Sequence, residues 1–414
     1  MKDELCEAIE KDLGRGKFYG YMSEIHLIKV EISHTIDHLK SWMKEQVVDT
    51  PLIVGPGKSY IKAEPLGVIC VMAAWNYPYY TLMGPASQVI AAGNCALLKP
   101  SELSPNCSIA MMKLCEKYLD PKYYKVIQGK AEVSKKLTSM RFDMIVFTGS
   151  TQKGKLVAAS AGKNLVPTVL ELGGKSPAIV DDSSDATLAA KKILFGKMPN
   201  YGQVCISPDY ILCHESKVDE FVRSLRENIM EKYGNCDSPS DSGKIINEFH
   251  YNRLCDLFED HGGEVLIGNK NTFKDRYLLP TLIKNPRKDC ALMQDEIFGP
   301  IWPMITYKHM DEVIDYVSTE QEKPLVVYYF GKKNGPGQKR VENETSSGSL
   351  VVNETIYQII NTDLPFGGVG HSGQGRYHGI SGFKAFSNEK SVLVKPSLDC
   401  FPFNLNYPPY TPEK

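Results

Sequence analysis

The sequence contains an uninterrupted apolar run, GVICVM at residues 67–72, which leads directly into AAWNYP at residues 73–78. A continuous apolar run of this length is typical of a strand buried in a parallel sheet. The run ends at the tryptophan–asparagine–tyrosine–proline sequence, and a helical stretch is expected over 80–92. This part of the chain therefore predicts a strand–turn–helix unit, the repeating element of an α/β fold.

The same unit recurs along the chain. Short apolar runs predict further strands over 94–99, 124–127, 144–147, 178–180 and 210–213, and near 300–306, 324–330 and 349–352. Helical segments are expected over 104–118, 131–138, 152–162, 184–196, 216–232 and 310–320. Strands that alternate with helices predict parallel sheets covered on both faces, with ligands bound beyond the carboxyl ends of the strands.

The alternation restarts after residue 172, which suits two domains in a chain of 414 residues. Residues 1–47 are expected to be helical, and residues 50–64 are expected to form a hairpin. A last strand is expected at 391–394. The expected fold class is α/β, with two open parallel-sheet domains and a small β element.

Composition and charge exclude several classes of function. A formal net charge of −1 and scattered Lys and Arg residues provide no basic stripe for nucleic acid. No apolar run approaches the ~18 residues of a membrane span, and the N-terminus lacks the apolar core of a secretory signal. The eleven cysteines form no CxxC pair, so we expect reduced thiols, no metal site and a soluble cytoplasmic protein.

The segment KMPNYGQVCISP at residues 197–208 is the first candidate for chemistry. Its two prolines and its glycine predict an ordered loop between regular elements. Such loops, held by a rigid scaffold, often display reactive side chains, and here the reactive side chain would be Cys205. The alternative is that Cys205 is a small buried apolar residue, as single cysteines commonly are.

Two further polar residues follow apolar runs. Asn76 lies just after the strand at 67–72, where its amide could donate to a developing oxyanion; the alternative is an ordinary turn asparagine. Glu171 lies in an apolar run just before Gly173 and Gly174, and its desolvation there would raise its pKa toward that of a general base. The alternative for Glu171 is an ion pair with a lysine such as Lys175.

Other residues suit a nucleotide. Lys99 and Glu102 lie at a strand-to-helix turn and either bind ribose hydroxyls or simply begin a helix. Gly149 and Ser150 lie between a strand and a helix, where free N–H groups and the helix dipole favour a phosphate. The literal G-x-G-x-x-G at 368–373 has no room for a βαβ unit after it, so we interpret it as a loop.

Glu296 and Phe298 combine an acid and an aromatic ring in EIFGP at 296–300. This pair could hold a ribose and a flat ring. The alternative is a turn at the entry of a strand.

The motifs occur in one order: PLGV at 65–68, WNYP at 75–78, KPSE at 99–102, FTGST at 147–151, LELGGKSP at 170–177, GQVC at 202–205, EIFGP at 296–300 and LPFGGVG at 364–370. Together they resemble the aldehyde dehydrogenase superfamily. WNYP, CISPDY at 205–210, RYHG at 376–379 and YPPY at 407–410 resemble its class 3 branch. The similarity runs from about residue 4 to the C-terminus.

This resemblance implies roles for the three candidate catalytic residues. Cys205 would be the nucleophile that forms a thiohemiacetal and then a thioester. The amide of Asn76 and the backbone N–H of Cys205 would hold the oxyanion. Glu171 would activate the water that hydrolyses the thioester, which favours a hydrolytic over an acylating reaction.

The resemblance also implies a cofactor, NAD or NADP, held by Trp75, Lys99, Glu102, Gly149, Ser150, Glu296 and Phe298. It assigns 1–49 and 64–171 to a variant Rossmann NAD(P)-binding domain and 172–385 to the catalytic domain. It assigns 50–63 and 386–414 to an oligomerisation hairpin and C-terminal strand, and so implies a homodimer. The implied substrates are medium-chain aliphatic or aromatic aldehydes.

Several features depart from the family pattern. Tyr201 stands where a small residue is usual and Val204 where threonine is usual; with Tyr77 they are candidates for the substrate mouth. The family's first helices have no counterpart before Met1, and residues 401–407 are too short and polar for a membrane anchor. The alternative function is therefore a catalytically impaired protein that binds cofactor or aldehyde.

Overall fold

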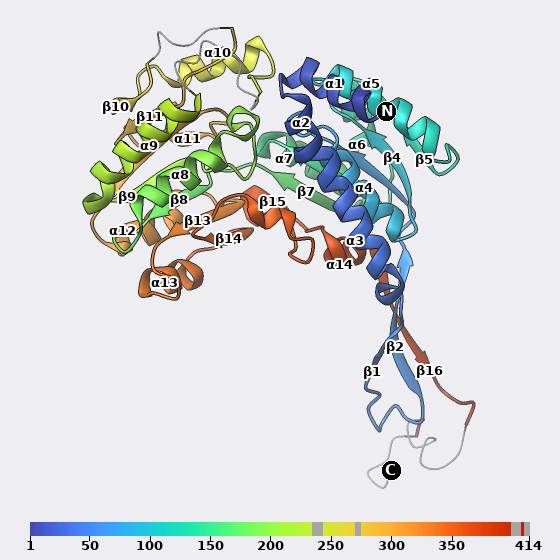
Figure 1. The fold of residues 1–414 in the computed structure, drawn as a ribbon. Coiled ribbons are helices and arrows are strands. Elements are labelled where there is room, and N and C mark those ends of the chain that lie inside the picture. The colour runs from blue at the N-terminus through green and yellow to red at the C-terminus, as the bar shows by residue number, and fades with distance from the viewer. Residues whose placement is uncertain (234–242, 270–274, 399–406, 410–414) are drawn as a thin grey trace.

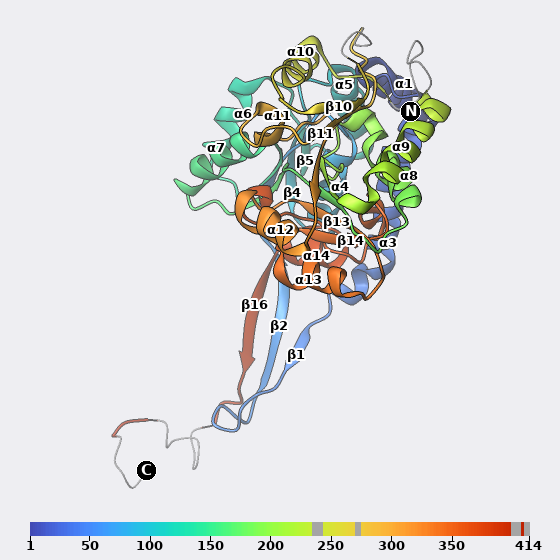
Figure 2. The ribbon, with the colours of Figure 1, turned by 90° about the vertical axis from the view of Figure 1, so that its left-hand side faces the viewer.

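The computed structural model describes residues 1–233, 243–269, 275–398 and 407–409. The chain forms two α/β lobes and a three-stranded arm that projects from one of them (Figures 1 and 2). This arrangement confirms the α/β fold class expected from the alternating strands and helices.

The first lobe is built on a six-stranded sheet in the order β15-β7-β6-β3-β4-β5. Its strands are β3 (Val68–Met72), β4 (Cys95–Lys99), β5 (Tyr124–Val126), β6 (Met144–Gly149), β7 (Thr168–Leu172) and β15 (Gly373–Gln374). All pairs are parallel except β15 with β7. The 368–373 glycine motif therefore leads into an edge strand.

Strand β3 lies inside this sheet and is buried on both faces, as its apolar run predicts. Ile69 and Val71 belong to one buried cluster, and Cys70 and Met72 belong to another. Successive side chains of a strand point to opposite faces. The helices that cover the two faces are α4 (Tyr80–Ala91), α5 (Pro105–Tyr118), α6 (Ala131–Thr138) and α7 (Thr151–Gly162).

The N-terminal helical region is interrupted rather than continuous. It consists of α1 (Lys2–Leu13), α2 (Lys17–Gly20), a π-helical turn η1 (Tyr21–His26) and α3 (Leu27–Trp42). Helix α1 ends at Gly14, whose left-handed φ of 69° is a conformation that glycine adopts readily. Helical periodicity alone did not reveal this break.

The buried carboxylate of Glu24 joins this N-terminal region to the start of α4. The guanidinium of Arg15 contacts the carboxylate of Glu24, and both side chains are fully buried. Glu24 Oε2 also accepts hydrogen bonds from the backbone N–H groups of Tyr79 and Tyr80, at 2.7 and 3.0 Å. These are unpaired donors of a helix N-terminus, so Glu24 fixes the chain immediately after Asn76.

The second lobe contains a seven-stranded sheet in the order β10-β11-β12-β9-β8-β13-β14. Its strands are β8 (Pro177–Val180), β9 (Tyr210–His214), β10 (Glu264–Ile267), β11 (Thr281–Lys284), β12 (Ile301–Tyr307), β13 (Val326–Phe330) and β14 (Ser349–Val352). Only β10 is antiparallel to its neighbour. The helices of this lobe are α8 (Ala186–Lys197), α9 (Val218–Tyr233), α10 (Glu248–Leu257), α11 (Ala291–Gln294), α12 (Met310–Asp315) and α13 (Pro336–Glu344). Helix α14 (Gly379–Ala385) comes later in the chain and packs against α3 and α4 of the first lobe.

The projecting arm is formed by β1 (Gln46–Val48), β2 (Lys58–Pro65) and β16 (Ser387–Val394), with β2 in the middle (Figures 1 and 2). The hairpin expected at 50–64 is present, but its first strand lies earlier: residues 46–48 pair with 59–61, and 52–54 form a turn. The apolar residues 51–54 lie at the exposed tip, where Leu52 is 98% exposed. Their apolar character was therefore misread as a strand signal.

Candidate active site

Cys205 lies in the loop between α8 and β9 and is partly buried. The loop turns through three successive residues with positive φ: Asn200 at 47°, Tyr201 at 59° and Gly202 at 81°. Such angles are uncommon outside glycine and asparagine. The loop is thus specifically shaped, as its proline and glycine content predicted.

Asn76 follows β3 and is 5% exposed. Its side-chain Nδ2 donates a hydrogen bond to the carbonyl oxygen of Gln203 at 3.0 Å. This bond joins segments 127 residues apart and places Asn76 against the loop, two residues before Cys205. The structure therefore brings together the two residues that sequence analysis assigned to the oxyanion and the nucleophile.

Glu171 lies on β7 and is 3% exposed. Neither carboxylate oxygen has a hydrogen-bond partner among the described residues. Burial raises the pKa of Glu171 well above its usual range, and Arg376 only partly opposes this effect. Lys175 donates instead to Asp209, at 2.6 Å, so the alternative ion pair between Lys175 and Glu171 is absent.

The electrostatic environment of Cys205 disfavours its thiolate. Burial, followed by the nearby carboxylates of Glu296 and Glu171, raises the pKa of Cys205 to about 12. Burial and the neighbouring Asp209 raise the pKa of Glu296 to about 8. The thiol is therefore protonated at neutral pH, and attack on a carbonyl requires a base to take its proton.

Glu296→Gln should make Cys205 more reactive in the free enzyme above about pH 8. There Glu296 is ionised, and its charge opposes thiolate formation, so removing it lowers the pKa of Cys205. We expect iodoacetamide to label Cys205 about 3- to 10-fold faster at pH 9, with a smaller difference at pH 7. Mass spectrometry of the Cys205 peptide measures the rate, Glu264→Gln on the exposed strand β10 is the control, and equal rates at pH 9 would contradict the prediction.

Two sets of predicted cofactor residues lie in the first lobe. Lys99 is 3% exposed and donates to the carboxylate of Glu102 at 3.0 Å and to a backbone carbonyl at 3.2 Å. Gly149 ends β6, and the exposed Ser150 is the N-cap residue of α7, accepting from the Lys153 N–H at 3.5 Å. The arrangement presents a cation, a carboxylate and a helix N-terminus at one edge of the sheet, which suits a dinucleotide.

A third set of predicted cofactor residues, Trp75, Glu296 and Phe298, lies where the second lobe faces the first. The rings of Phe298 and Trp75 are nearly perpendicular, with their centroids 5.3 Å apart. The carboxylate of Glu296 lies so close to Gly173 that a Cβ there would fall 1.9 Å from Oε2. Glycine at this position thus permits Glu296 to reach the region of Cys205. These are the side chains that the sequence predicted for the NAD or NADP site.

Comparison with known proteins agrees with this arrangement. The model of the aldehyde dehydrogenase family matches residues 1–392. The chain belongs to the aldehyde dehydrogenase family. It is an oxidoreductase that oxidises aldehydes with NAD or NADP.

Two curated relatives illustrate the similarity. The 4,4'-diaponeurosporen-aldehyde dehydrogenase of Staphylococcus aureus is 42% identical over 410 residues, which cover 99% of this chain and 88% of that protein. Aldehyde dehydrogenase family 3 member B3 of Mus musculus is 39% identical, covering 99% of this chain and 85% of the relative. The chain is thus similar to the class 3 branch, as its motifs predicted.

Solved structures show the same fold. The substrate-bound state of Staphylococcus aureus AldH has a TM-score of 0.93 and 41% identity, with 99% of this chain and 88% of that chain covered. A 3,6-anhydro-L-galactose dehydrogenase solved "in Complex with NAP" has a TM-score of 0.85 and 25% identity, covering 95% and 84%.

The predicted substrate-mouth residues of this aldehyde dehydrogenase have different surroundings. The Tyr77 ring is partly buried under the guanidinium of Arg15, 4.6 Å from the ring centroid. Tyr201 is 2% exposed, and its hydroxyl donates to the carbonyl oxygen of Leu278 at 2.8 Å. Val204 is 9% exposed. We therefore expect Tyr201 to affect the substrate mainly through the conformation of the Cys205 loop.

Some residues that support the site of this aldehyde dehydrogenase were not among those predicted from the sequence. Arg15 and Glu24 fix the chain after Asn76, and Asn200 and Gln203 hold the Cys205 loop. The polar character of Asn200 and Gln203 was visible beside Cys205. No sequence signal indicates that Asn200 bonds to Asn76, or that Gln203 bonds to Lys244 and Ile246.

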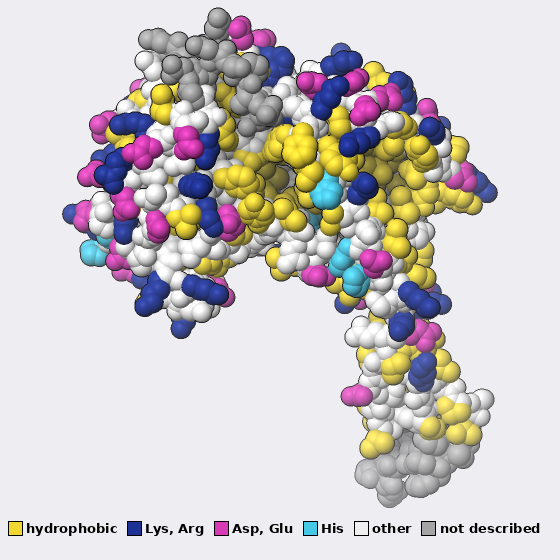
Figure 3. All heavy atoms as spheres, in the orientation of Figure 1, with side chains coloured by type: hydrophobic (Ala, Val, Ile, Leu, Met, Phe, Trp, Pro, Cys, Tyr) yellow, Lys and Arg dark blue, Asp and Glu magenta, His cyan; other side chains and the backbone are white. Residues whose placement is uncertain are grey.

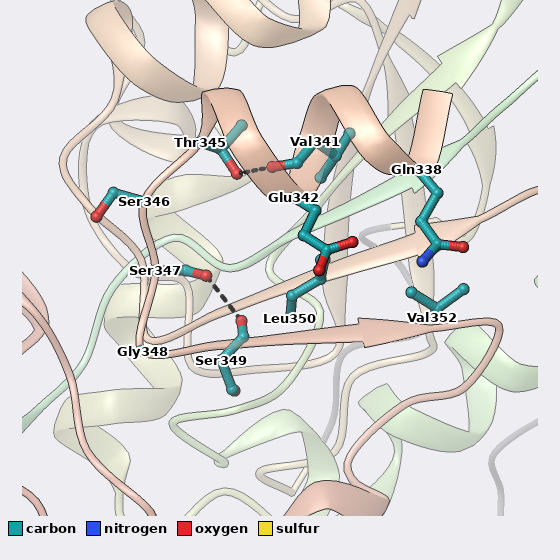
Figure 4. Close-up of a pocket in the computed structure, with 10 residues that line it drawn as sticks. All are labelled: Gln338, Val341, Glu342, Thr345, Ser346, Ser347, Gly348, Ser349, Leu350 and Val352. Carbon is teal, nitrogen blue, oxygen red and sulfur yellow. Dashed lines mark hydrogen bonds between the residues drawn. The ribbon is translucent and has the colours of Figure 1, made fainter. Parts of the chain in front are cut away.

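A groove of about 460 Å³ lies elsewhere, between α13 and β14 (Figure 4). Its Thr345 hydroxyl donates to the Val341 carbonyl at 2.6 Å, and its Ser347 hydroxyl donates to the Ser349 carbonyl at 2.8 Å. The lining contains no cysteine, histidine or lysine. It is therefore not the aldehyde dehydrogenase site. Within the described ranges, no cluster of residues suits a metal ion, and no helix is long and apolar enough to cross a membrane.

Proposed function

We propose that Cys205, Asn76 and Glu171 carry out the oxidation of an aldehyde to a carboxylic acid. The observation that supports this most directly is the hydrogen bond from Asn76 Nδ2 to the Gln203 carbonyl, since it sets an amide donor beside the cysteine loop. Glu171 is near enough to raise the pKa of Cys205. A nucleophile, an oxyanion donor and a buried carboxyl group thus share one site.

The first half of the reaction is attack on the aldehyde. Cys205 gives up its thiol proton to a base, and its sulfur forms a bond to the carbonyl carbon. The oxygen becomes an oxyanion, which accepts hydrogen bonds from Asn76 Nδ2 and from the backbone N–H of Cys205. Lys99, Glu102, Ser150, Glu296 and Phe298, with Trp75 and Gly149, would hold NAD(P)⁺, which when bound would accept the hydride released from the former aldehyde carbon. As that carbon–hydrogen bond breaks, the oxyanion re-forms the carbonyl, and Cys205 is left as a thioester.

The second half is hydrolysis of the thioester on Cys205. Glu171 in its ionised form takes a proton from a water molecule, whose oxygen attacks the thioester carbon. The carbon–sulfur bond breaks and releases the carboxylic acid, and the proton taken up by Glu171 passes to the leaving sulfur, which returns Cys205 as a thiol. Because burial raises the pKa of Glu171, this step speeds up as pH rises through that raised value.

We propose medium-chain aliphatic or aromatic aldehydes as substrates. The test mixes purified protein with NAD⁺ or NADP⁺ and hexanal, benzaldehyde, a semialdehyde or a long apolar aldehyde, and follows absorbance of the reduced cofactor. Turnover of hexanal or benzaldehyde supports the proposal, whereas preference for the semialdehyde contradicts the substrate class. Cofactor binding without turnover of any aldehyde would favour the impaired relative.

We also propose that two copies associate through the arm. The arm projects from the first lobe (Figure 1) and shows apolar side chains on its surface (Figure 3); Val47, Leu52, Ile53 and Leu393 are between 52% and 98% exposed. Exposed apolar side chains on a projecting sheet favour burial against a partner. Light scattering should give the mass of a dimer, and Leu52→Asp with Ile53→Asp should shift it toward the monomer.

The cysteines of the described ranges are all free, which supports a reducing, cytoplasmic location.

A further inference from the structure

We propose that Asn200 is a positioning residue, which holds the oxyanion donor Asn76 in register with the nucleophile loop. The inference rests on the proposed role of Asn76. It adds a residue that does not touch the aldehyde but determines where Asn76 points. Three hydrogen bonds and one unusual backbone conformation carry it.

The three hydrogen bonds form a closed ring. Asn200 Nδ2 donates to the backbone carbonyl of Asn76 at 2.9 Å and to the carbonyl of Gln203 at 3.1 Å. Asn76 Nδ2 donates to the same Gln203 carbonyl at 3.0 Å. The ring thus connects the backbone and the side chain of Asn76 to the loop that carries Cys205.

Each N–H donor of the two asparagine side chains in this ring has an assigned acceptor. A primary amide has two N–H donors, and Asn200 uses its two on Asn76 and Gln203. Asn76 uses one on Gln203, which leaves its second for the oxyanion. Because the Gln203 carbonyl accepts from both side chains, the direction of that second N–H depends on where Asn200 holds the carbonyl.

The surroundings of the ring are rigid. Asn200 and Gln203 are 0% exposed. Gln203 Nε2 donates to the carbonyls of Asn200 and Lys244 at 2.9 and 3.0 Å, and Gln203 Oε1 accepts from the Ile246 N–H at 3.0 Å. The loop therefore holds its own shape, and Asn200 supplies its side-chain link to the backbone of Asn76.

The backbone angle of Asn200 determines which substitution can test this role. Its φ of 47° is left-handed, a region that asparagine and glycine tolerate but alanine does not. Asn200→Gly therefore removes both donors without adding backbone strain. Asn334 lies in an exposed turn at φ 59°, so Asn334→Gly is a matched control with the same backbone change at the surface.

The experiment is a double-mutant cycle on kcat with NAD⁺ and hexanal. We expect Asn76→Ala to lower kcat about 100-fold, because an oxyanion donor is lost. Asn200→Gly should lower kcat about 10-fold through misplacement of that donor, with KM changed less than about twofold, because the oxyanion develops only after the aldehyde has bound and Cys205 attacks it. The combined variant should be no slower than Asn76→Ala alone, since Asn200 acts through Asn76.

Two further readouts separate positioning from general damage. NAD⁺ binding and the iodoacetamide labelling rate of Cys205 should stay unchanged in Asn200→Gly, as should every property of Asn334→Gly. If Asn200→Gly does not fold, Asn200→Asp keeps the side-chain shape while replacing the donors, and it enters the same cycle.

Losses that multiply in the combined variant, or full kcat in Asn200→Gly, would overturn the inference. Full activity of Asn76→Ala alone is a separate result, which would overturn the proposed role of Asn76 and the inference with it.

Discussion

Cys205→Ala is expected to abolish aldehyde-dependent reduction of NAD⁺, lowering kcat by about 10³-fold or more. Without the sulfur no thiohemiacetal forms, and no other side chain of the loop takes over the covalent attack on the aldehyde. Cofactor binding should be kept, because the predicted cofactor residues lie on other segments. Steady-state absorbance of the reduced cofactor and a separate NAD⁺ binding titration measure the two effects.

Cys95→Ala is the matched control for this variant. Cys95 is also a free, partly buried thiol, and it begins β4 in the six-stranded sheet. It should retain normal activity. Substantial activity of Cys205→Ala, or loss of cofactor binding together with activity, would show that Cys205 has a structural rather than a nucleophilic role.

The sequence predicted the two parallel sheets well, because strands buried on both faces are continuous apolar runs. The run at 67–72 became β3 for this reason. Prediction from the sequence failed where the local residue pattern and the tertiary surroundings disagree. Residues 51–54 are apolar yet form the exposed tip of the arm. The short strands β10 and β11 lie in a region that carried no clear alternation.

The candidate site was predictable where a residue is chemically distinctive and follows a strand or a proline-rich turn. Cys205, Asn76 and Glu171 met that condition. Their electrostatic coupling did not follow from the sequence: the charge of Glu296 raises the pKa of Cys205 because the fold brings together two loops of the second lobe that are distant in the chain. The partnership of Asn200 with Asn76 spans 124 residues, and no local pattern encodes such a distance.

Glu171→Gln is expected to separate the two halves of the reaction. Cys205 can still form the thioester, so the first turnover should release one reduced cofactor per active site as a rapid burst. Hydrolysis then lacks its base, and the steady-state rate should fall about 10²- to 10⁴-fold. Stopped-flow absorbance resolves the burst from the slow phase, and mass spectrometry of quenched samples should find the acyl group on Cys205.

The pH dependence distinguishes a base from a structural carboxyl group. Burial raises the pKa of Glu171, so the wild-type steady-state rate should rise with pH along a limb placed well above the usual carboxyl range. This limb should vanish in Glu171→Gln, while Glu264→Gln on an exposed strand keeps it. If Glu171→Gln loses the burst as well, the carboxylate must already act when Cys205 gives up its proton. The raised pKa of Cys205 makes that base necessary, so such a result would assign Glu171 to the first half of the reaction as well as the second.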